Sequence, residues 1–180
     1  MAGRRTDTRE RIQRVALELF AEQGYEGSSL REIAERLNVT KAALYYHFRT
    51  KEDIVSSLLE GWGAALDDLL ERETGPAELI TAYAGLVESR FGPVIGLVQR
   101  NTSALKAIAA GAGLADRMLR LHERLRGGSA DPESDLRARL ALVAVQLNSA
   151  EGGPRTPSDV ALAVALDVLS PDGKAAGAGT

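Results

Sequence analysis

The stretch Thr40–Lys51, TKAALYYHFRTK, predicts a short helix whose surface carries two adjacent tyrosines, a histidine and basic residues. Thr40 is a typical N-cap residue, because its hydroxyl can accept a hydrogen bond from a free backbone N–H in the first turn. Thr50 is a second candidate cap, and Asp53 follows it at the capping-box position. A helix of barely two turns is not stable alone in water, so neighbouring segments must hold it in place.

One face of this helix is predicted to pack against its own domain. Leu44 and Phe48 are four residues apart and therefore lie on the same side. On another side, Lys41, Ala42 and Ala43 leave the first turn slim. A slim turn lets a helix come close to base edges in the major groove of DNA.

Tyr45, Tyr46 and His47 project from the remaining surface and can donate hydrogen bonds to phosphate oxygens. Lys51 lies in the first turn of the next helix, where the helix dipole also favours an anion. The same aromatic residues also fit partly buried packing positions of a plain αα-hairpin. For Arg31, on the preceding helix, a solvated surface position is the more common interpretation, since exposed arginines on helices are usually only solvated.

The segments before Thr40 predict two further helices. Asp7 is a candidate N-cap for the first, and the residues before it, with Arg4 and Arg5, are expected to form a flexible basic arm. Ser29 and Glu32 form a capping box for the second helix, and Asn38 suits the left-handed residue that ends it. Two short helices joined by such a turn form a helix-turn-helix.

Composition excludes several classes of site. The 180 residues include no cysteine and only two histidines, so disulfides and thiolate metal sites are excluded and a zinc site is poorly supplied. No apolar run is long enough for a membrane span, and no secretion signal is evident, so a cytoplasmic protein is expected. Residues 1–51 hold ten Lys and Arg against seven Asp and Glu, whereas residues 52–180 hold twelve against eighteen. A basic head on an acidic body favours an anionic partner for the head.

The rest of the chain shows helical periodicity and no alternating strand pattern. We expect Gly92-Pro93 to interrupt it and residues 171–180, rich in Gly and Ala, to form a flexible tail. The predicted helices cover Lys51 to about Leu70, Pro76 to about Arg90, Val94 to about Ala110, Leu114–Arg126, residues 131–150 and residues 158–169.

The last two predicted helices, 131–150 and 158–169, are apolar on nearly every side over residues 140–147 and 158–169. Short helices of this kind must be buried all round. In a chain of this size the partner surface is most easily a second copy, so a homodimer through these helices is predicted.

Thr8–Ile54 resembles the DNA-binding domain of TetR-type transcriptional regulators. The resemblance rests on ERIQRVALELFAEQGYEGSSLREIAERLNVTKAALYYHF and RTKEDI taken together. It implies an all-α fold with a three-helix DNA-binding domain (1–51), a helical ligand-binding and dimerisation domain (52–170) and a tail (171–180). It also implies a homodimer that binds palindromic operator DNA as a ligand-responsive regulator, most often a repressor.

The resemblance further implies roles for single residues. Lys41, Ala42 and Ala43 would face base edges, and Arg31 matches a position that reads a base in some members. Phosphate contacts would come from Thr40, Tyr45, Tyr46, His47 and Lys51, with Tyr46 also able to reach a base.

A pocket for an unknown small-molecule effector would lie among the helices of residues 55–126. Its candidate lining residues also fit plain core or surface positions. They are Trp62, Tyr83, Arg117, Met118 and His122.

The sequence does not favour an enzyme, because it lacks nucleophile-elbow, metalloprotease, P-loop and dinucleotide motifs. No cofactor is expected. The alternative from another class is a helical ligand-binding or scaffolding protein whose N-terminal head binds a protein partner.

Overall fold

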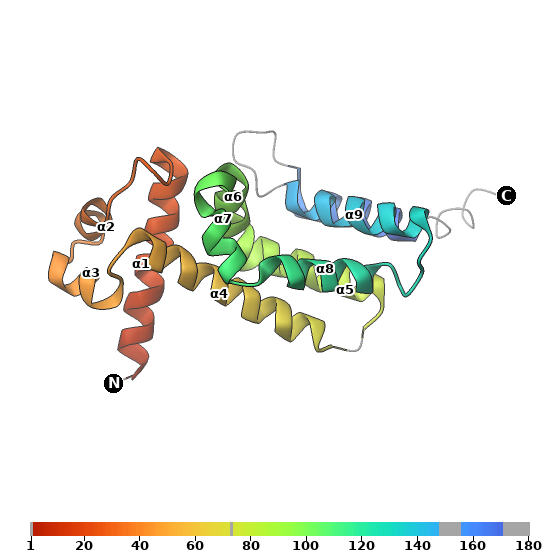
Figure 1. Cartoon of the computed structure of the whole chain (residues 1–180), viewed down its shortest axis with the longest axis horizontal. Helices are drawn as coiled ribbons and strands as arrows, with labels where there is room; N and C mark the ends of the chain where they lie inside the picture. Colours follow the sequence, from red (N-terminus) through yellow and green to blue (C-terminus); the bar gives the residue numbers. More distant parts are fainter. Residues whose placement is uncertain (1, 73, 148–155, 171–180) are drawn as a thin grey trace.

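The computed structural model describes residues 2–72, 74–147 and 156–170, and every regular element in these ranges is helical. Figure 1 shows α1, α2 and α3 at one end of the molecule, with α4 running from them along the body. The elements are α1 (Ala2–Gln23), α2 (Leu30–Arg36), α3 (Lys41–His47), α4 (Lys51–Leu70), α5 (Pro76–Leu86), the π-helical turn η1 (Val87–Phe91), α6 (Gly92–Arg100), α7 (Thr102–Gly111), α8 (Leu114–Leu125), α9 (Pro132–Gln146) and α10 (Ser158–Leu169). The predicted all-α fold is confirmed.

α4 connects the two ends of the molecule. Thr50 and Asp53 form its capping box, as the sequence predicted. Its twenty residues span about 30 Å, and it packs against α1 at one end and against α5, α7 and α8 along the body. At its C-terminus the Arg124 guanidinium donates hydrogen bonds to the carbonyls of Leu70, Arg72 and Thr74, which satisfies groups that a helix end leaves free.

The expected interruption at Gly92-Pro93 is wrong, because the chain stays helical from α5 through η1 into α6. Pro93 has no N–H, so it cannot bond the carbonyl of Ser89 as an α-helix requires. The backbone adapts by widening: the N–H of Gly92 bonds the carbonyl of Val87, five residues back. The proline thus produces a π-helical turn instead of a helix end.

Two helix limits also differ from expectation. α1 begins at Ala2, so Arg4 and Arg5 belong to the helix rather than to a flexible arm; Ala and Arg favour helix, and no proline prevents it. The segment expected to be helical from Val94 to Ala110 is divided at Asn101, whose side-chain amide bonds the carbonyl of Leu97 and ends α6.

The predicted domain boundary after residue 51 falls inside the first turn of α4, so no linker separates head from body, and the division into domains stays a prediction. The predicted helix 158–169 coincides with α10. Of the predicted helix 131–150, α9 covers Pro132–Gln146; residues 148–150 and the predicted tail 171–180 lie outside the described residues.

α9 and α10 pack against each other and against α5. Their inner faces are buried, but their outward faces are exposed in the single chain, so a second copy of the chain, as the sequence analysis predicts, would have to cover them. We name this surface the α9–α10 outer face. Its large apolar side chains are 45–65% exposed in the single chain: Leu136, Leu140, Val143, Leu147, Val160 and Val164.

Two glycines of α4 offer a matched test of packing. A Cβ at Gly61 would meet nothing within 4 Å, whereas a Cβ at Gly63 would lie 3.2 Å from Cζ of Arg117. Gly61→Ala should raise the free energy of unfolding by about 0.5–1 kcal/mol, because alanine loses less backbone entropy in a helix. Gly63→Ala should give no gain or a loss, because Arg117 must shift. Urea unfolding at one protein concentration measures both, and equal gains would contradict the packing role of Gly63.

Candidate nucleic-acid interface

The helix-turn-helix begins with a complete capping box at α2. The backbone N–H of Ser29 donates to the Glu32 carboxylate at 2.8 Å, and the N–H of Glu32 donates to the Ser29 hydroxyl at 3.3 Å. After α2 the chain turns through Asn38, whose φ of 54° lies in the left-handed region, as the sequence predicted. The N–H of Val39 then bonds the carbonyl of Ala34 at 3.0 Å. Local chemistry therefore sets the angle at which α3 leaves the turn.

α3 is held by one buried face. Thr40 caps its N-terminus, and the Thr40 hydroxyl accepts from the N–H of Ala43 at 3.2 Å. Leu44 is fully buried and Phe48 is 2% exposed, which confirms the predicted packing side of the helix. The guanidinium of Arg9 from α1 lies 4.6 Å from the centre of the Phe48 ring and covers it from outside. Contacts from outside α3 thus stabilise a helix too short to be stable alone.

The opposite face of α3 is open to solvent. Lys41, Ala42 and Ala43 are exposed, and the side chains of Tyr45 and Tyr46 are 47% and 67% exposed. The two tyrosines are therefore not packing residues of a plain αα-hairpin. His47 is half-buried and meets the ring of Tyr46 edge-on, with 5.4 Å between ring centres.

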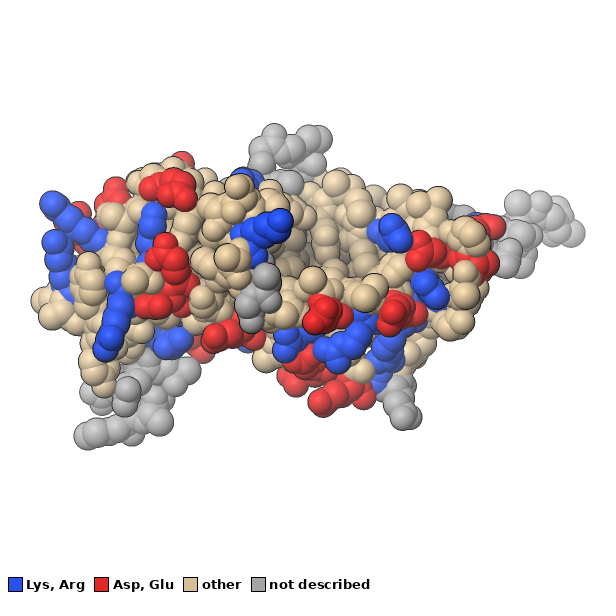
Figure 2. Space-filling model, in the orientation of Figure 1, with Lys and Arg blue, Asp and Glu red and all other residues tan. Residues whose placement is uncertain are grey.

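The surface around this face is polar. Tyr45, Tyr46 and His47 line a shallow hollow of about 340 Å³, shared with Arg9 and Arg49. Figure 2 shows Lys and Arg side chains at the α2–α3 end of the molecule, with Asp and Glu beside them. The exposed phenols and basic side chains can donate hydrogen bonds to anionic oxygens.

Lys51 has a role that the sequence did not reveal. Its ammonium donates to the carbonyl of Tyr25 at 2.6 Å and to that of Glu26 at 3.4 Å, and it lies 4.6 Å from the centre of the Tyr25 ring. Lys51 thus holds the turn after α1 against the start of α4. An ammonium has three N–H donors, so one remains for a partner outside the chain.

Two side-chain hydrogen bonds also connect the head to α4. The hydroxyl of Tyr25 donates to the Glu52 carboxylate at 3.0 Å, and the Gln13 amide donates to the Ser57 hydroxyl at 2.5 Å. Burial, followed by the bond to Glu52, raises the pKa of Tyr25 well above its usual range. Gln13 and Ser57 are 44 residues apart, and no local sequence pattern could have paired them.

Arg31 forms an exposed ion pair with Glu35, one turn later on α2, with 2.7 Å between Nε and Oε1. Arg36 on the same helix forms a two-pronged pair with Glu22 of α1, at 2.6 and 2.8 Å. The first pair leaves Arg31 on the surface of α2, whereas the second holds α2 against α1.

The structure places three of the predicted ligand-binding residues in the packed body. Trp62 is 6% exposed, and its indole N–H is buried without a hydrogen-bond partner. Tyr83 is fully buried; its hydroxyl accepts from the Gln146 amide at 2.7 Å, and burial raises its pKa to about 12. His122 is 9% exposed, with Nε2 at 3.2 Å from the carbonyl oxygen and 3.3 Å from the carboxylate of Asp135.

The other two predicted ligand-binding residues lie nearer the surface. Arg117 donates to the Asp67 carboxylate through Nε and Nη2, at 2.7–3.0 Å, and to the carbonyl of Ala112. The Arg117 hydrogen bonds hold the pKa of Asp67 below its usual range. Met118 is half-buried against the core. The ligand-binding role of all five residues stays a prediction.

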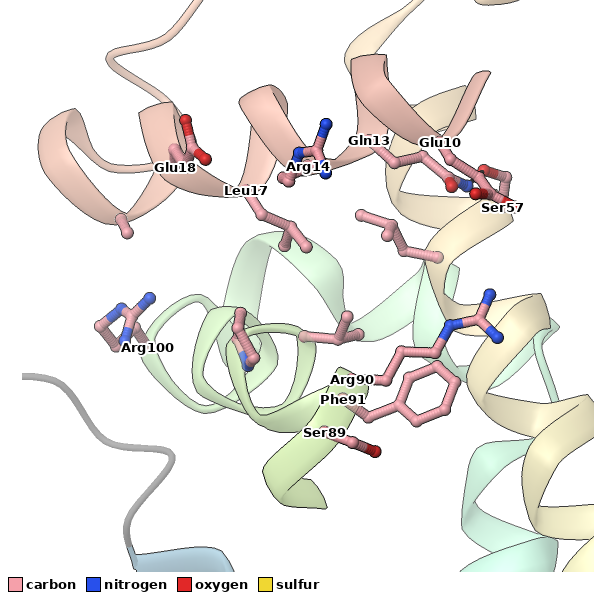
Figure 3. A pocket seen from close by; sticks show the side chains of 14 residues that line it. Glu10, Gln13, Arg14, Leu17, Glu18, Ser57, Ser89, Arg90, Phe91 and Arg100 are labelled. Atoms are coloured by element: carbon pink, nitrogen blue, oxygen red, sulfur yellow. Dashed lines mark hydrogen bonds between the residues drawn. The ribbon is translucent and has the colours of Figure 1, made fainter. Parts of the chain in front are cut away.

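A separate cleft lies between the head and the body. We name it the α1–α6 cleft, and its volume is about 600 Å³. None of the five predicted ligand-binding residues lines it. Side chains from α1, α4, η1 and α6 surround it, as Figure 3 shows for ten labelled residues.

The described part of the chain offers neither a metal-binding cluster nor a membrane-spanning helix. No cluster of three or more His, Asp or Glu side chains there could hold a metal ion. No helix there is both long and apolar enough to cross a membrane.

Residues 12–58 match the family model described as "Bacterial regulatory proteins, tetR family". The Shigella flexneri HTH-type transcriptional regulator AcrR is 46% identical over 54 residues, which cover 30% of this chain and 25% of that protein. The Staphylococcus epidermidis biofilm operon icaADBC HTH-type negative transcriptional regulator IcaR is 44% identical over 45 residues, 25% of this chain and 24% of that protein. The matched stretch thus spans about a quarter of these relatives.

Solved structures resemble the chain over most of its length. The TetR family transcriptional regulator PfmR from Thermus thermophilus has a TM-score of 0.64 and 26% identity, over 88% of this chain and 97% of that one. AmtR from Mycobacterium smegmatis has a TM-score of 0.64 and 27% identity, over 89% and 85%. A transcriptional regulator from Aquifex aeolicus has a TM-score of 0.69 over 90% and 97%, and at 23% identity it supports the fold alone.

The turn residue Asn38 gives a stability test of the helix-turn-helix. Asn38→Val should lower the free energy of unfolding by about 1–2 kcal/mol, because a β-branched side chain clashes with the backbone at positive φ. Asn38→Gly is the matched control, since glycine adopts this conformation freely and should keep or raise stability. Chemical unfolding measures both, and equal stability of the two variants would contradict the strain argument.

Proposed function

Because residues 12–58 match the family of bacterial regulatory proteins of the tetR type, we propose that the chain is a transcriptional regulator that binds palindromic operator DNA as a homodimer. A small-molecule effector would release it, and repression is the expected outcome. The observation that carries the proposal is the open face of α3, where Tyr45 and Tyr46 stand exposed while Leu44 and Phe48 hold the helix from below.

α3 would enter the major groove with its slim N-terminal turn first. Lys41, Ala42 and Ala43 are exposed together at that turn, so the backbone can approach base edges and the lysine can reach an acceptor such as a guanine O6 or N7. Arg31 lies nearby on α2. Exposed ion pairs such as Arg31–Glu35 contribute little net energy, so the guanidinium could exchange Glu35 for DNA.

The DNA phosphates would be bound by residues at the two ends of α3 and at the start of α4. Thr40 lies at the N-terminus of α3, and Tyr45, Tyr46 and His47 lie at its C-terminal half. The third ammonium hydrogen of Lys51 would complete the set, while its other two donors hold the turn after α1. These contacts position the helix and carry no sequence information directly.

The α9–α10 outer face supports the homodimer. Leu136, Leu140, Val143 and Leu147 recur at intervals of four, three and four residues and form one stripe along α9, and Val160 and Val164 continue it on α10. An exposed apolar surface of this extent marks an interaction site. Two copies packed through it would form a four-helix interface, and they would present two α3 helices to one duplex.

Effector control would act through the spacing of the two heads. α4 joins each head to its body without a linker, so a shift of the body moves α3. An effector that binds better to a spacing unsuited to successive major grooves would lower the population able to bind DNA. The alternative, a head that binds a protein partner, has no observation in the described residues that favours it over DNA.

The DNA-contact assignment is tested on fragments selected from genomic DNA by binding to the purified protein. Lys41→Ala should change base preference at one position of each half-site, since a base contact is lost. Tyr46→Phe should weaken binding to all fragments alike and leave the salt slope unchanged, because a neutral hydroxyl displaces no counterion. Fluorescence anisotropy at several salt concentrations measures both, with Lys106→Ala on α7 as a control outside the interface.

Lys51→Met separates the two roles of Lys51. A phosphate contact predicts that the slope of log affinity against log salt falls by about 0.9, whereas the intramolecular bonds predict a loss of thermal stability. We expect both changes. A loss of stability with an unchanged salt slope would contradict the phosphate contact.

The dimer is tested at the middle of the apolar stripe. Leu140→Glu should convert the protein to a monomer at micromolar concentration, because the dimer would bury two carboxylates without partners. Leu119→Glu is the matched control, since Leu119 is 56% exposed on α8, outside the stripe. Sedimentation velocity distinguishes the species, and a dimer that survives Leu140→Glu, or a wild-type monomer, would contradict the assigned interface.

A further inference from the structure

The α1–α6 cleft has the size and the mixed lining of a small-molecule site. Its volume of about 600 Å³ lies within the range of ligand pockets in proteins, about 300–1,000 Å³. One wall belongs to the head, through Gln13, Arg14 and Leu17 of α1, and the opposite wall belongs to η1 and α6 of the body. Figure 3 shows Leu17 pointing from α1 toward η1 and α6, with Arg90 and Arg100 to either side.

The lining combines an apolar floor with charged groups of both signs, because Glu10 and Glu18 of α1 line the cleft together with Arg14, Arg90 and Arg100. Phe91 and Val94 are 3% and 1% exposed, and each contributes to the floor. Arg14 and Arg90 are exposed at the rim, and within the residues that the structure describes neither forms an ion pair. A guanidinium without a carboxylate partner, next to apolar surface, matches a ligand that has an anionic group attached to an apolar body.

The backbone beside the cleft is irregular. Arg90 and Phe91 belong to the π-helical turn that Pro93 imposes, and the Arg90 guanidinium lies 5.2 Å from the centre of the Phe91 ring. π-helical turns occur frequently at functional sites, because one extra residue in the turn re-aims its side chains. Here the turn places the Arg90 cation at the rim of the cleft, beside the Phe91 ring of its floor.

We propose that the α1–α6 cleft binds a carboxylate with an apolar body, and that this is the site through which an effector controls the head. Control of the head by this ligand rests on the proposed function, whereas binding of the ligand in the cleft does not. The carboxylate binds Arg14 and Arg90, and the apolar body lies on Leu17, Phe91 and Val94. This location differs from the interior pocket that the sequence predicted among residues 55–126.

Binding here acts directly on the joint between head and body. The ligand contacts α1 of the head and η1–α6 of the body at once, so it sets the distance between them. The Gln13–Ser57 hydrogen bond lies in the wall of the same cleft and connects α1 to α4. A ligand that changes the α1–α6 distance therefore also strains or relieves a contact that orients the head.

The test uses decanoate as the probe and decan-1-ol as its uncharged counterpart, with the whole chain of 180 residues. Isothermal titration calorimetry without DNA measures binding. Decanoate should bind at least tenfold more tightly than the alcohol, because only the carboxylate can pair with the guanidinium groups. The double variant Arg14→Gln/Arg90→Gln should lose that difference. Lys106→Gln, which removes an exposed positive charge outside the cleft, should keep it.

The outcomes distinguish ligand binding in the cleft from an effect of that ligand on DNA binding. Decanoate binding that is absent, or that the double variant leaves unchanged, overturns the site. In a second measurement, decanoate is added to the complex of the protein with selected DNA. It should lower the affinity of the wild-type protein for DNA but leave the affinity of the double variant unchanged. Binding at the cleft without any effect on a DNA complex retains the site and overturns its regulatory role. If the protein binds no DNA, the proposed function is wrong, but the calorimetric evidence for a ligand site in the cleft still holds.

Discussion

The burial of Leu44 and Phe48 under α3 is the interaction on which the arrangement of the head depends. α3 has seven residues, too few for a stable helix in water, so its conformation comes from contacts outside it. Once these two side chains are buried, the period of the helix turns Lys41, Ala42, Tyr45 and Tyr46 outward. The exposed face is therefore a geometric consequence of the buried one.

The start of α4 transmits that arrangement to the body. Lys51 bonds the turn after α1, the Tyr25 hydroxyl bonds Glu52, and Gln13 bonds Ser57. These three contacts lie within two turns of a helix that continues through the body. A movement of α1 relative to α6 must therefore distort specific hydrogen bonds, which gives the α1–α6 cleft a physical connection to the position of α3.

Several features of the head were predictable from short stretches of sequence, because their causes are local. The capping boxes at Ser29 and Thr50 and the left-handed Asn38 each depend on residues within four positions. The effect of Pro93 was harder to predict. Its missing N–H excludes a regular α-helix, but whether the chain ends there or widens into a π-helical turn depends on the packing of Val87 and Phe91 on the core.

Local periodicity and capping thus determined α2, α3, the turn between them and the division of α3 into a buried and an open side. Long-range packing decided the rest. Lys51 was predicted as a phosphate ligand, yet its contacts in the chain are with carbonyls 25 and 26 residues away. Trp62, Tyr83 and His122 lie in the packed body, while a cleft formed at α1 and η1, because a cavity exists only where elements distant in sequence meet imperfectly. A sequence pattern indicates which residues share a face of one helix. A cleft depends on how several helices pack against one another.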